Sequence, residues 1–321
     1  MKLQILVPHY KETEEVIKPL LDSMAIQQNV NFNEVSVIVC HDGLDIADLN
    51  LPDYPFEIKQ IRQEHKGVSA ARNACLDAST AEYVMFCDAD DMFYNACGLW
   101  ILFKEIDIGF DSLVSCFTEE TRMPDTQEIM YINHDTDSTF VHGKVHRRQY
   151  LIDEGIRWNE NLTIHEDSYF NILCQNLSKN VKYCPTPFYL WKWRDDSVCR
   201  HDPKYILKTY RNMIDSNDAL IDEFSKRNAN DKVMFFTAFL IFDAYYTMNK
   251  PEWINQENKE YRDSTERRFS EYYAKHKATW KSVPTNDKMM ISNQVRSRSV
   301  MEGMTMETAT IDDWLKHISN I

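Results

Sequence analysis

The chain has 321 residues, of which 36 are Lys or Arg and 50 are Asp or Glu, so its formal net charge is −14. This acidic balance argues against a protein that binds nucleic acid by neutralising phosphates, although a local basic pocket stays open. The length allows one large domain or two smaller ones, and a hydrophobic content of 43% is ordinary for a globular protein.

Targeting and membrane signals are weak. Pro8 breaks the apolar N-terminus too soon for a signal peptide. The apolar run over residues 233–242 is about half the roughly 20 residues that a membrane span needs, so a buried helix is the better interpretation. No Cys-x-x-Cys pair occurs among the eight cysteines. We expect reduced core cysteines in a cytoplasmic protein, not disulfides or a zinc site.

Strand and helix patterns alternate over the first hundred residues. Apolar or alternating runs predict strands over residues 3–7, 35–40, 56–61 and 83–87. Helical spacing predicts helices over 12–27 and 69–78, the second with Ser69 as its N-cap after the Gly67 loop. Such alternation implies an α/β fold with a mostly parallel sheet and helices on both faces.

The pattern becomes helical after about residue 200. Helices are predicted over 205–224, 231–248, 260–280 and 312–318. We therefore expect an α/β domain over residues 1–202. A helical C-terminal region follows over 203–321, and binding of a substrate, oligomerisation or plain packing would each explain it.

Acidic residues follow the fourth predicted strand directly, as Asp88-Ala89-Asp90-Asp91. In open parallel sheets, ligands bind beyond the carboxyl ends of the strands. Asp88 and Asp90 lie two residues apart, so both point to one side of an extended chain. Mg²⁺ or Mn²⁺, with phosphates completing its shell, would relieve the repulsion between these carboxylates. A solvated acidic turn is the commoner fate of an isolated Asp-x-Asp.

The order of motifs resembles glycosyltransferase family 2, whose members have the GT-A fold and use nucleotide-diphospho-sugars. The resemblance covers about residues 1–200 and rests on a long ordered set. The motifs are Val7-Pro8-His9-Tyr10, His65-Lys66-Gly67 with Ala71-Arg72-Asn73, the Asp88–Asp91 cluster, Gly143-Lys144, Gly155 to Glu160, and Glu166-Asp167. Lys11, His41, Leu44 and His65 depart from the family pattern and leave the nucleobase and the donor sugar open.

The resemblance implies roles in donor binding. Tyr10 would offer its ring to the base, and Asp42 would accept a hydrogen bond from a uracil-type imide. Arg72 would reach the diphosphate, and Arg194 with Ser197 would close over it as a lid. The other expected donor-site residues are Pro8, Glu12, Lys66, Asp88 and Ala89.

The resemblance also implies a metal site and a catalytic base. Asp90 is the expected metal ligand, with Asp88 on metal-bound water or ribose and His201 as a third ligand. Asp167 would be the general base, with Glu166 as a helper, because a carboxylate must take the proton of the acceptor hydroxyl as the new bond forms.

Structural alternatives exist for most of these residues. Tyr10 fits a packed aromatic equally well, and Asp42 fits a turn before Gly43. Glu12 and the Glu166-Asp167 pair fit helix N-termini, where the dipole favours acidic residues. For Arg72 and His201 the alternatives are a solvated helix arginine and a surface histidine.

The expected reaction is inverting transfer of a hexose or N-acetylhexosamine from a UDP-sugar to a hydroxyl. The acceptor would be a glycan, a polyol-phosphate polymer, a lipid-linked sugar or a protein, and transfer to a DNA base is disfavoured by the acidic charge. Peripheral contact with the inner face of a membrane and homo-oligomerisation through the C-terminal region stay open. Two rivals are a nucleotidyltransferase, which should show an N-terminal Gly-rich loop, and a non-catalytic sugar-nucleotide or glycan-binding module. Residues 1–30 contain no glycine.

Overall fold

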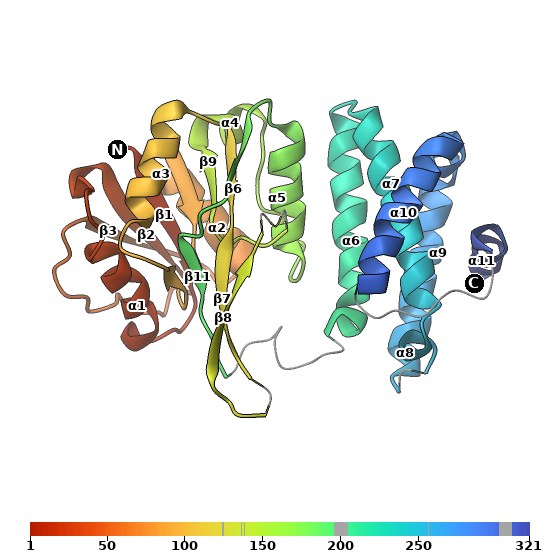
Figure 1. Cartoon of the computed structure of the whole chain (residues 1–321), viewed down its shortest axis with the longest axis horizontal. Helices are drawn as coiled ribbons and strands as arrows, with labels where there is room; N and C mark the ends of the chain where they lie inside the picture. The colour runs from red at the N-terminus through yellow and green to blue at the C-terminus, as the bar shows by residue number, and fades with distance from the viewer. Residues whose placement is uncertain (124, 136, 138, 196–204, 256, 302–309) are drawn as a thin grey trace. The chain divides into compact units, whose positions relative to one another are not determined.

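The computed structural model describes the chain except residues 124, 136, 138, 196–204, 256 and 302–309 (Figure 1). Ser197 and His201, predicted as donor and metal ligands, lie outside the described residues. The chain divides into two compact units, Met1–Ser197 and Val198–Ile321, and each is described by itself.

A seven-stranded sheet forms the centre of the first unit, with strand order β10-β6-β9-β4-β1-β2-β3. All neighbours pair in parallel except β9, which is antiparallel to both β4 and β6. The predicted mostly parallel α/β sheet is therefore confirmed. The strands are β1 (Leu3–His9), β2 (Val35–Asp42), β3 (Glu57–Gln63), β4 (Tyr83–Phe86), β6 (Ser112–Ser115), β9 (Lys144–Arg147) and β10 (Val181–Cys184).

Helices cover both faces of this sheet (Figure 1). Apolar residues of α1 and α3 share one core with alternate residues of β1 and β2. On the opposite face, the Phe86 ring packs edge-on against Trp158 and Phe170, and Phe170 belongs to α5. The helices of this unit are α1 (Glu14–Ala25), η1 (Phe32–Glu34, a 3₁₀ turn), α2 (Val68–Ala78), α3 (Gly98–Ile108), α4 (Arg148–Asp153) and α5 (Glu166–Leu177).

The predicted N-cap of the second helix is wrong by two residues. Gly67, not Ser69, is the N-cap of α2, the helix begins at Val68, and Ser69 is buried inside the first turn. Gly67 has φ +93°, a backbone conformation that suits glycine, and this sharp turn lets the helix begin earlier than the Ser69 signal suggests.

A second sheet extends the first unit and was not predicted. Its strand order is β5-β11-β7-β8, and β7 with β8 forms the hairpin that projects downward in Figure 1. The strands are β5 (Met92–Phe93), β11 (Tyr189–Trp191), β7 (Phe117–Arg122) and β8 (Ile129–His134).

The second unit is helical, as predicted, with aromatic contacts such as Phe224–Phe236 and Phe269–Trp314 in its core. Its helices are α6 (Tyr205–Lys226), α7 (Asn230–Met248), α8 (Pro251–Ile254), α9 (Lys259–Ser282), α10 (Thr285–Met301) and α11 (Ile311–Ile318). Among the described helices, none has both the length and the apolar character that a transmembrane segment needs.

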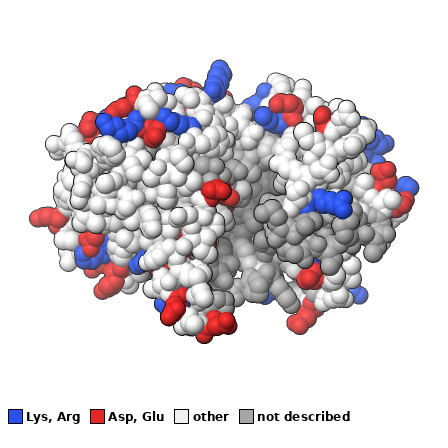
Figure 2. Space-filling view, in the orientation of Figure 1, with Lys and Arg blue, Asp and Glu red and all other residues white. Residues whose placement is uncertain are grey.

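The described cysteines are all free thiols, and all of them except Cys97 are buried. This confirms the prediction of reduced core cysteines for that part of the chain. On the face drawn in Figure 2, Lys and Arg side chains stand beside Asp and Glu side chains along the edges.

Candidate functional site

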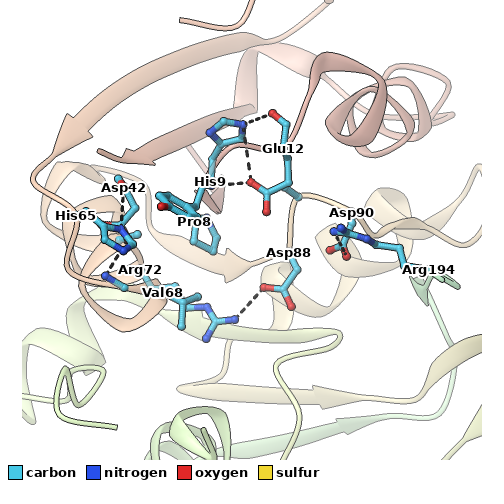
Figure 3. Close-up of a pocket in the computed structure, with 14 residues that line it drawn as sticks. Pro8, His9, Glu12, Asp42, His65, Val68, Arg72, Asp88, Asp90 and Arg194 are labelled. Carbon is cyan, nitrogen blue, oxygen red and sulfur yellow. Dashed lines mark hydrogen bonds and ion pairs between the residues drawn. The ribbon is translucent and has the colours of Figure 1, made fainter. Parts of the chain in front are cut away.

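A cavity of about 350 Å³ lies beyond the carboxyl ends of β1, β2 and β4 (Figure 3). The strand register explains its position, because His9 pairs with His41 across β1 and β2 while Leu6 pairs with Phe86 on β4. The loops that follow these strands therefore meet at one edge of the sheet. The cavity is lined by Pro8, His9, Tyr10, Glu12, Asp42, His65, Gly67, Val68, Ala71, Arg72, Asp88, Ala89, Asp90 and Arg194.

Asp42, at the end of β2, organises the loop before α2. Its carboxylate accepts hydrogen bonds from the backbone amides of Lys66 (2.9 Å) and Gly67 (2.8 Å) and from Gln63 Nε2 (2.8 Å). His65 Nδ1 lies 2.8 Å from Oδ2, the oxygen that also accepts from Gly67. Burial alone would raise the pKa of Asp42, but these contacts together lower it below its usual value. Asp42 is therefore a charged, buried anchor at the cavity wall.

Tyr10 and Glu12 belong to a tight turn between β1 and α1. The Tyr10 amide donates a 2.6 Å hydrogen bond to Glu12 Oε2, and Lys11 between them has φ +64°. Tyr10 is 41% exposed, and its ring stacks on the His65 ring at 4.4 Å between centroids. The aromatic face is thus presented at the cavity and is not packed into the core.

Arg72 joins two acidic segments that are far apart in the sequence. Its guanidinium donates to Asp88 Oδ1 at 2.8 Å and to Glu166 Oε1 at 3.0 Å (Asp88 is shown in Figure 3). The side chain is only 4% exposed, and its Cζ lies 4.3 Å from the centre of the Trp158 ring. Burial opposes the charge, but the two carboxylates outweigh it and raise the pKa of Arg72. Arg72 is a buried cation, not a solvated helix residue.

The carboxylates of the acidic loop have separate partners. Asp90 pairs with Arg194 at 2.9 Å, and burial together with the charge of Asp88 raises the pKa of Asp90. Asp91 is buried and accepts hydrogen bonds from the Tyr189 hydroxyl and the Lys192 amide. Burial and the charges of Asp90 and Asp88 raise the pKa of Asp91 well above its usual value. Negative charge on this loop is therefore unfavourable, and a cation would relieve it.

Three side chains place metal-binding atoms close together. One carboxylate oxygen each of Asp88 and Asp91 and one ring nitrogen of His142 lie within 4.8 Å of one another. Hard oxygen donors with one imidazole suit Mg²⁺ or Mn²⁺, so the residues present fit such an ion. The expected ligand Asp90 is not in this group, and its carboxylate is paired with Arg194.

Glu166 and Asp167 form the first turn of α5, directly after His165 in a left-handed conformation (φ +62°). Asp167 is half-buried, and its carboxylate accepts a 2.7 Å hydrogen bond from the Ser168 amide. Burial and the neighbouring charge of Glu166 raise the pKa of Asp167 to about 7, although Arg72 opposes this. A carboxylate with such a pKa is suited to take a proton near neutral pH.

Most of the predicted donor-site residues lie around one cavity, but not all of them. Pro8, Tyr10, Glu12, Asp42, Arg72, Asp88, Ala89, Asp90 and Arg194 line it. The Lys66 side chain is 59% exposed and lies outside the lining, so only its amide contributes, through Asp42. Glu166 and Asp167 are also outside the lining, and Glu166 is connected to the cavity through Arg72.

The sequence interpretation missed several residues near the site. His9 and His65 line the cavity. The sequence could have indicated this, because both residues stand inside the motifs on which the resemblance rests. Lys144 on β9 was given no role, yet it is 1% exposed and its Nζ has no hydrogen-bond partner in the described part of the chain. The residue before it, Gly143, has φ +64°, and a Cβ there would lie 2.2 Å from Ser115 Oγ.

Comparison with known proteins gives a consistent result. The sequence profile described as glycosyl transferase family 2 matches residues 4–166. The putative glycosyltransferase EpsH of Bacillus subtilis (strain 168) is 22% identical over 247 residues, which is 70% of each chain. The crystal structure of S. aureus TarS 1–349 in complex with UDP superposes with a TM-score of 0.59 at 16% identity, covering 97% of this chain and 95% of that one. For the UDP-GlcNAc complex of TarS the TM-score is 0.57 at 17% identity, covering 92% of each chain.

The structural likeness confirms the predicted GT-A fold with a helical C-terminal region. The family profile spans just over half of the chain and includes every residue that lines the cavity except Arg194. Both comparisons agree with the motif order found in the sequence. The chain belongs to glycosyltransferase family 2, and it is a glycosyltransferase.

Proposed function

We propose that this enzyme transfers a hexose or N-acetylhexosamine from a UDP-sugar to a hydroxyl group, with inversion at the anomeric carbon. The observation that carries the proposal is the bridge made by Arg72, which links the acidic loop to the start of α5. A donor diphosphate at Arg72 would then lie between the acidic loop and the carboxylate of Asp167. Donor binding and base catalysis would share one site.

The donor site is proposed from charge and shape. Arg72 and Arg194 supply positive charge for the diphosphate, and bidentate guanidinium groups suit phosphate oxygens. Tyr10 offers an exposed ring for the base, and Asp42 lines the same wall. TarS was crystallised with UDP and with UDP-GlcNAc, so these are the first donors to test here.

A divalent ion would be held by carboxylates of the acidic loop. Asp88 is common to the predicted set and to the cluster of Asp88, Asp91 and His142, while Asp90 would contribute after leaving Arg194. Such an ion supplies positive charge against the leaving diphosphate.

The proton transfer is assigned to Asp167. The acceptor hydroxyl gives its proton to the Asp167 carboxylate while its oxygen bonds to the anomeric carbon. The bond from that carbon to the diphosphate oxygen breaks on the opposite face, so the configuration inverts. Arg72 balances the negative charge that builds on the leaving group. Glu166 keeps Arg72 in place through its ion pair.

The acceptor is proposed only by class: a glycan, a polyol-phosphate polymer, a lipid-linked sugar or a protein. We propose that the helical unit binds the acceptor or forms an oligomer. We also propose a cytoplasmic location and no nucleic-acid partner. The acidic net charge of −14 supports the last point.

The test is incubation of the full chain with UDP-sugars, with and without Mn²⁺. Metal-dependent release of UDP that is lost in Asp90→Ala and Asp167→Asn, while both variants stay folded by circular dichroism, supports the proposal. Glu64→Gln, an exposed removal of a carboxylate on the loop between β3 and α2, is the control and should keep activity. Release of pyrophosphate would instead indicate a nucleotidyltransferase, and binding without turnover a non-catalytic module.

A further inference from the structure

Two buried histidines meet beneath the cavity. His9 ends β1 and is 3% exposed, and His41 lies opposite it on β2 with no exposed surface. Their Nδ1 atoms are 2.9 Å apart, with the rings nearly perpendicular. A contact this short between two ring nitrogens requires one proton between them, because two lone pairs would repel.

The outer nitrogen of His41 must also carry a proton. His41 Nε2 lies 2.8 Å from Gln60 Oε1. The orientation of the Gln60 amide is fixed by Leu49, whose N–H donates to the same oxygen at 2.8 Å and whose carbonyl accepts from Gln60 Nε2 at 3.1 Å. The group facing His41 is therefore an acceptor, and Nε2 must donate to it.

The same reasoning applies to His9. Its Nε2 lies 2.7 Å from the backbone carbonyl oxygen of Glu12, which can only accept. The two rings thus need three protons on four nitrogens: one on each outer nitrogen and one between the rings. Two neutral imidazoles carry only two protons, so this geometry requires one positive charge on the pair.

The surrounding charges suit a single cation. Glu12 Oε2 lies 3.9 Å from His9 Nε2, and Asp48 Oδ1 lies 3.8 Å from His41 Nε2. Arg62 on β3 faces His41 as well, but its charge is paired with Asp48 at 2.7 Å. Burial, together with the charge of the neighbouring ring, lowers the pKa of His41, which favours one positive charge on the pair and not two.

We infer that His9 and His41 share one proton as a buried imidazole–imidazolium pair, and that this pair positions the turn at Tyr10–Glu12 for nucleotide binding. The inference rests on the proposed UDP-sugar site. His9 holds the Glu12 carbonyl, and the Glu12 carboxylate holds the Tyr10 amide. Loss of the proton leaves two protons for three contacts, so one contact fails: the one between the rings, the one to the Glu12 carbonyl or the one to Gln60 Oε1. Failure of either contact of His9 loosens the turn.

The first test is nuclear magnetic resonance of histidine ring nitrogens in the isotope-labelled full chain, between about pH 5 and about pH 9. We expect one doubly protonated ring and one neutral Nε2–H ring that titrate together in a single step, with the Tyr10 amide losing protection in the same step. Two neutral rings throughout, or two independent titrations, would overturn the inference. This readout does not depend on UDP binding or turnover.

The second test measures UDP binding by calorimetry over the same pH range. One linked proton predicts an affinity that falls by up to about tenfold per pH unit above the titration of the pair. His41→Asn should bind UDP as tightly as the protonated wild type, and its affinity should not depend on pH. The reason is that the Asn amide can donate to His9 Nδ1 at any pH. His41→Phe, which cannot, should bind weakly at every pH.

The control on the pH dependence is His65→Gln, which removes the other histidine at the cavity. Because His65 stacks on Tyr10, this change should weaken UDP binding but keep the dependence of the affinity on pH. A merely structural role would make His41→Asn and His41→Phe behave alike, and this outcome refutes the positioning role. The positioning role is also refuted if the UDP affinity of His41→Asn depends on pH as strongly as that of the wild type. If the wild type binds no UDP at any pH, the donor proposal fails, while the ring-nitrogen spectra and the Tyr10 amide still decide the state of the pair.

Discussion

Replacing Asp167 by Asn should make the fold more stable and the enzyme inactive. The amide has the shape of the carboxyl group, and its oxygen can still accept the hydrogen bond from the Ser168 amide. What changes is the negative charge at the start of α5, beside Glu166. That charge is unfavourable in the folded protein, as the raised pKa of Asp167 indicates.

The size of the effect follows from the pKa. A shift from 3.8 to about 7 corresponds to about 4 kcal/mol, at about 1.4 kcal/mol per unit. Asp167 is only half-buried, and its charge interacts with those of Glu166 and Arg72. We therefore expect the variant to be more stable by about 2 kcal/mol. The folded pKa is raised, so the wild type loses this stability as the pH rises from about 4 to about 7. The variant should match the wild type near pH 4 and exceed it above pH 7.

The assay is urea unfolding of the full chain at several pH values, with UDP release measured on the same samples. Wild-type kcat/KM should rise with pH through about 7, as the base loses its proton, and the variant should lose about 10²–10⁴-fold of it. If the variant is less stable than the wild type at pH 8, or equally stable at every pH, then the charge of Asp167 is not unfavourable in the folded protein and the reasoning fails. An active variant would refute its role in proton transfer.

Three further predictions concern stability. Lys144→Met should raise the free energy of unfolding by about 1–3 kcal/mol at pH 7 in urea titrations, because burial lowers the pKa of Lys144 to about 8, and the gain should vanish between about pH 8 and 10.5. Gly67→Ala should lower the free energy of unfolding by about 1 kcal/mol, because a side chain is strained at φ +93°. Calorimetry should also show weaker UDP binding, because the backbone amide of residue 67 that donates to Asp42 would shift. Asp218→Asn should destabilise the helical unit by about 3 kcal/mol in chemical unfolding at pH 7, because partners such as His276 lose a buried carboxylate. The pKa of Asp218 is lowered, so that loss should shrink as the pH falls below about 4.

Local patterns were enough to predict the strands that carry the site. The β-branched run before Asp42 and the apolar run before Asp88 read as buried strands, and the structure has strands there. Parallel pairing then brings their ends together without any knowledge of the loops. The short strands of the second sheet gave no such signal, because β5 has two residues and β8 is exposed along most of its length. Helix α10 is polar without a clear apolar stripe, so periodicity could not reveal it.

The partners of the site residues were beyond a single sequence. Arg72 meets Glu166 across 94 positions, and His41 meets His9 across 32. Which of these atoms come within hydrogen-bond distance depends on strand register and helix docking, and no local propensity encodes either. The sequence therefore predicted residue types at the edge of the sheet correctly, but not that Arg72 is buried between two carboxylates.

That arrangement bears on metal dependence. The two arginines that line the cavity are already paired, Arg72 with Asp88 and Glu166, and Arg194 with Asp90. A diphosphate that recruits them must compete with those carboxylates, and each carboxylate left behind would repel the incoming anion. A divalent cation on the acidic loop removes this repulsion, so donor and metal should bind together far better than either alone. Calorimetry with UDP and Mn²⁺ should show that each tightens the other by the same factor. In Asp88→Asn the coupling should fall, whereas equal UDP affinity with and without the ion in the wild type would contradict this reasoning.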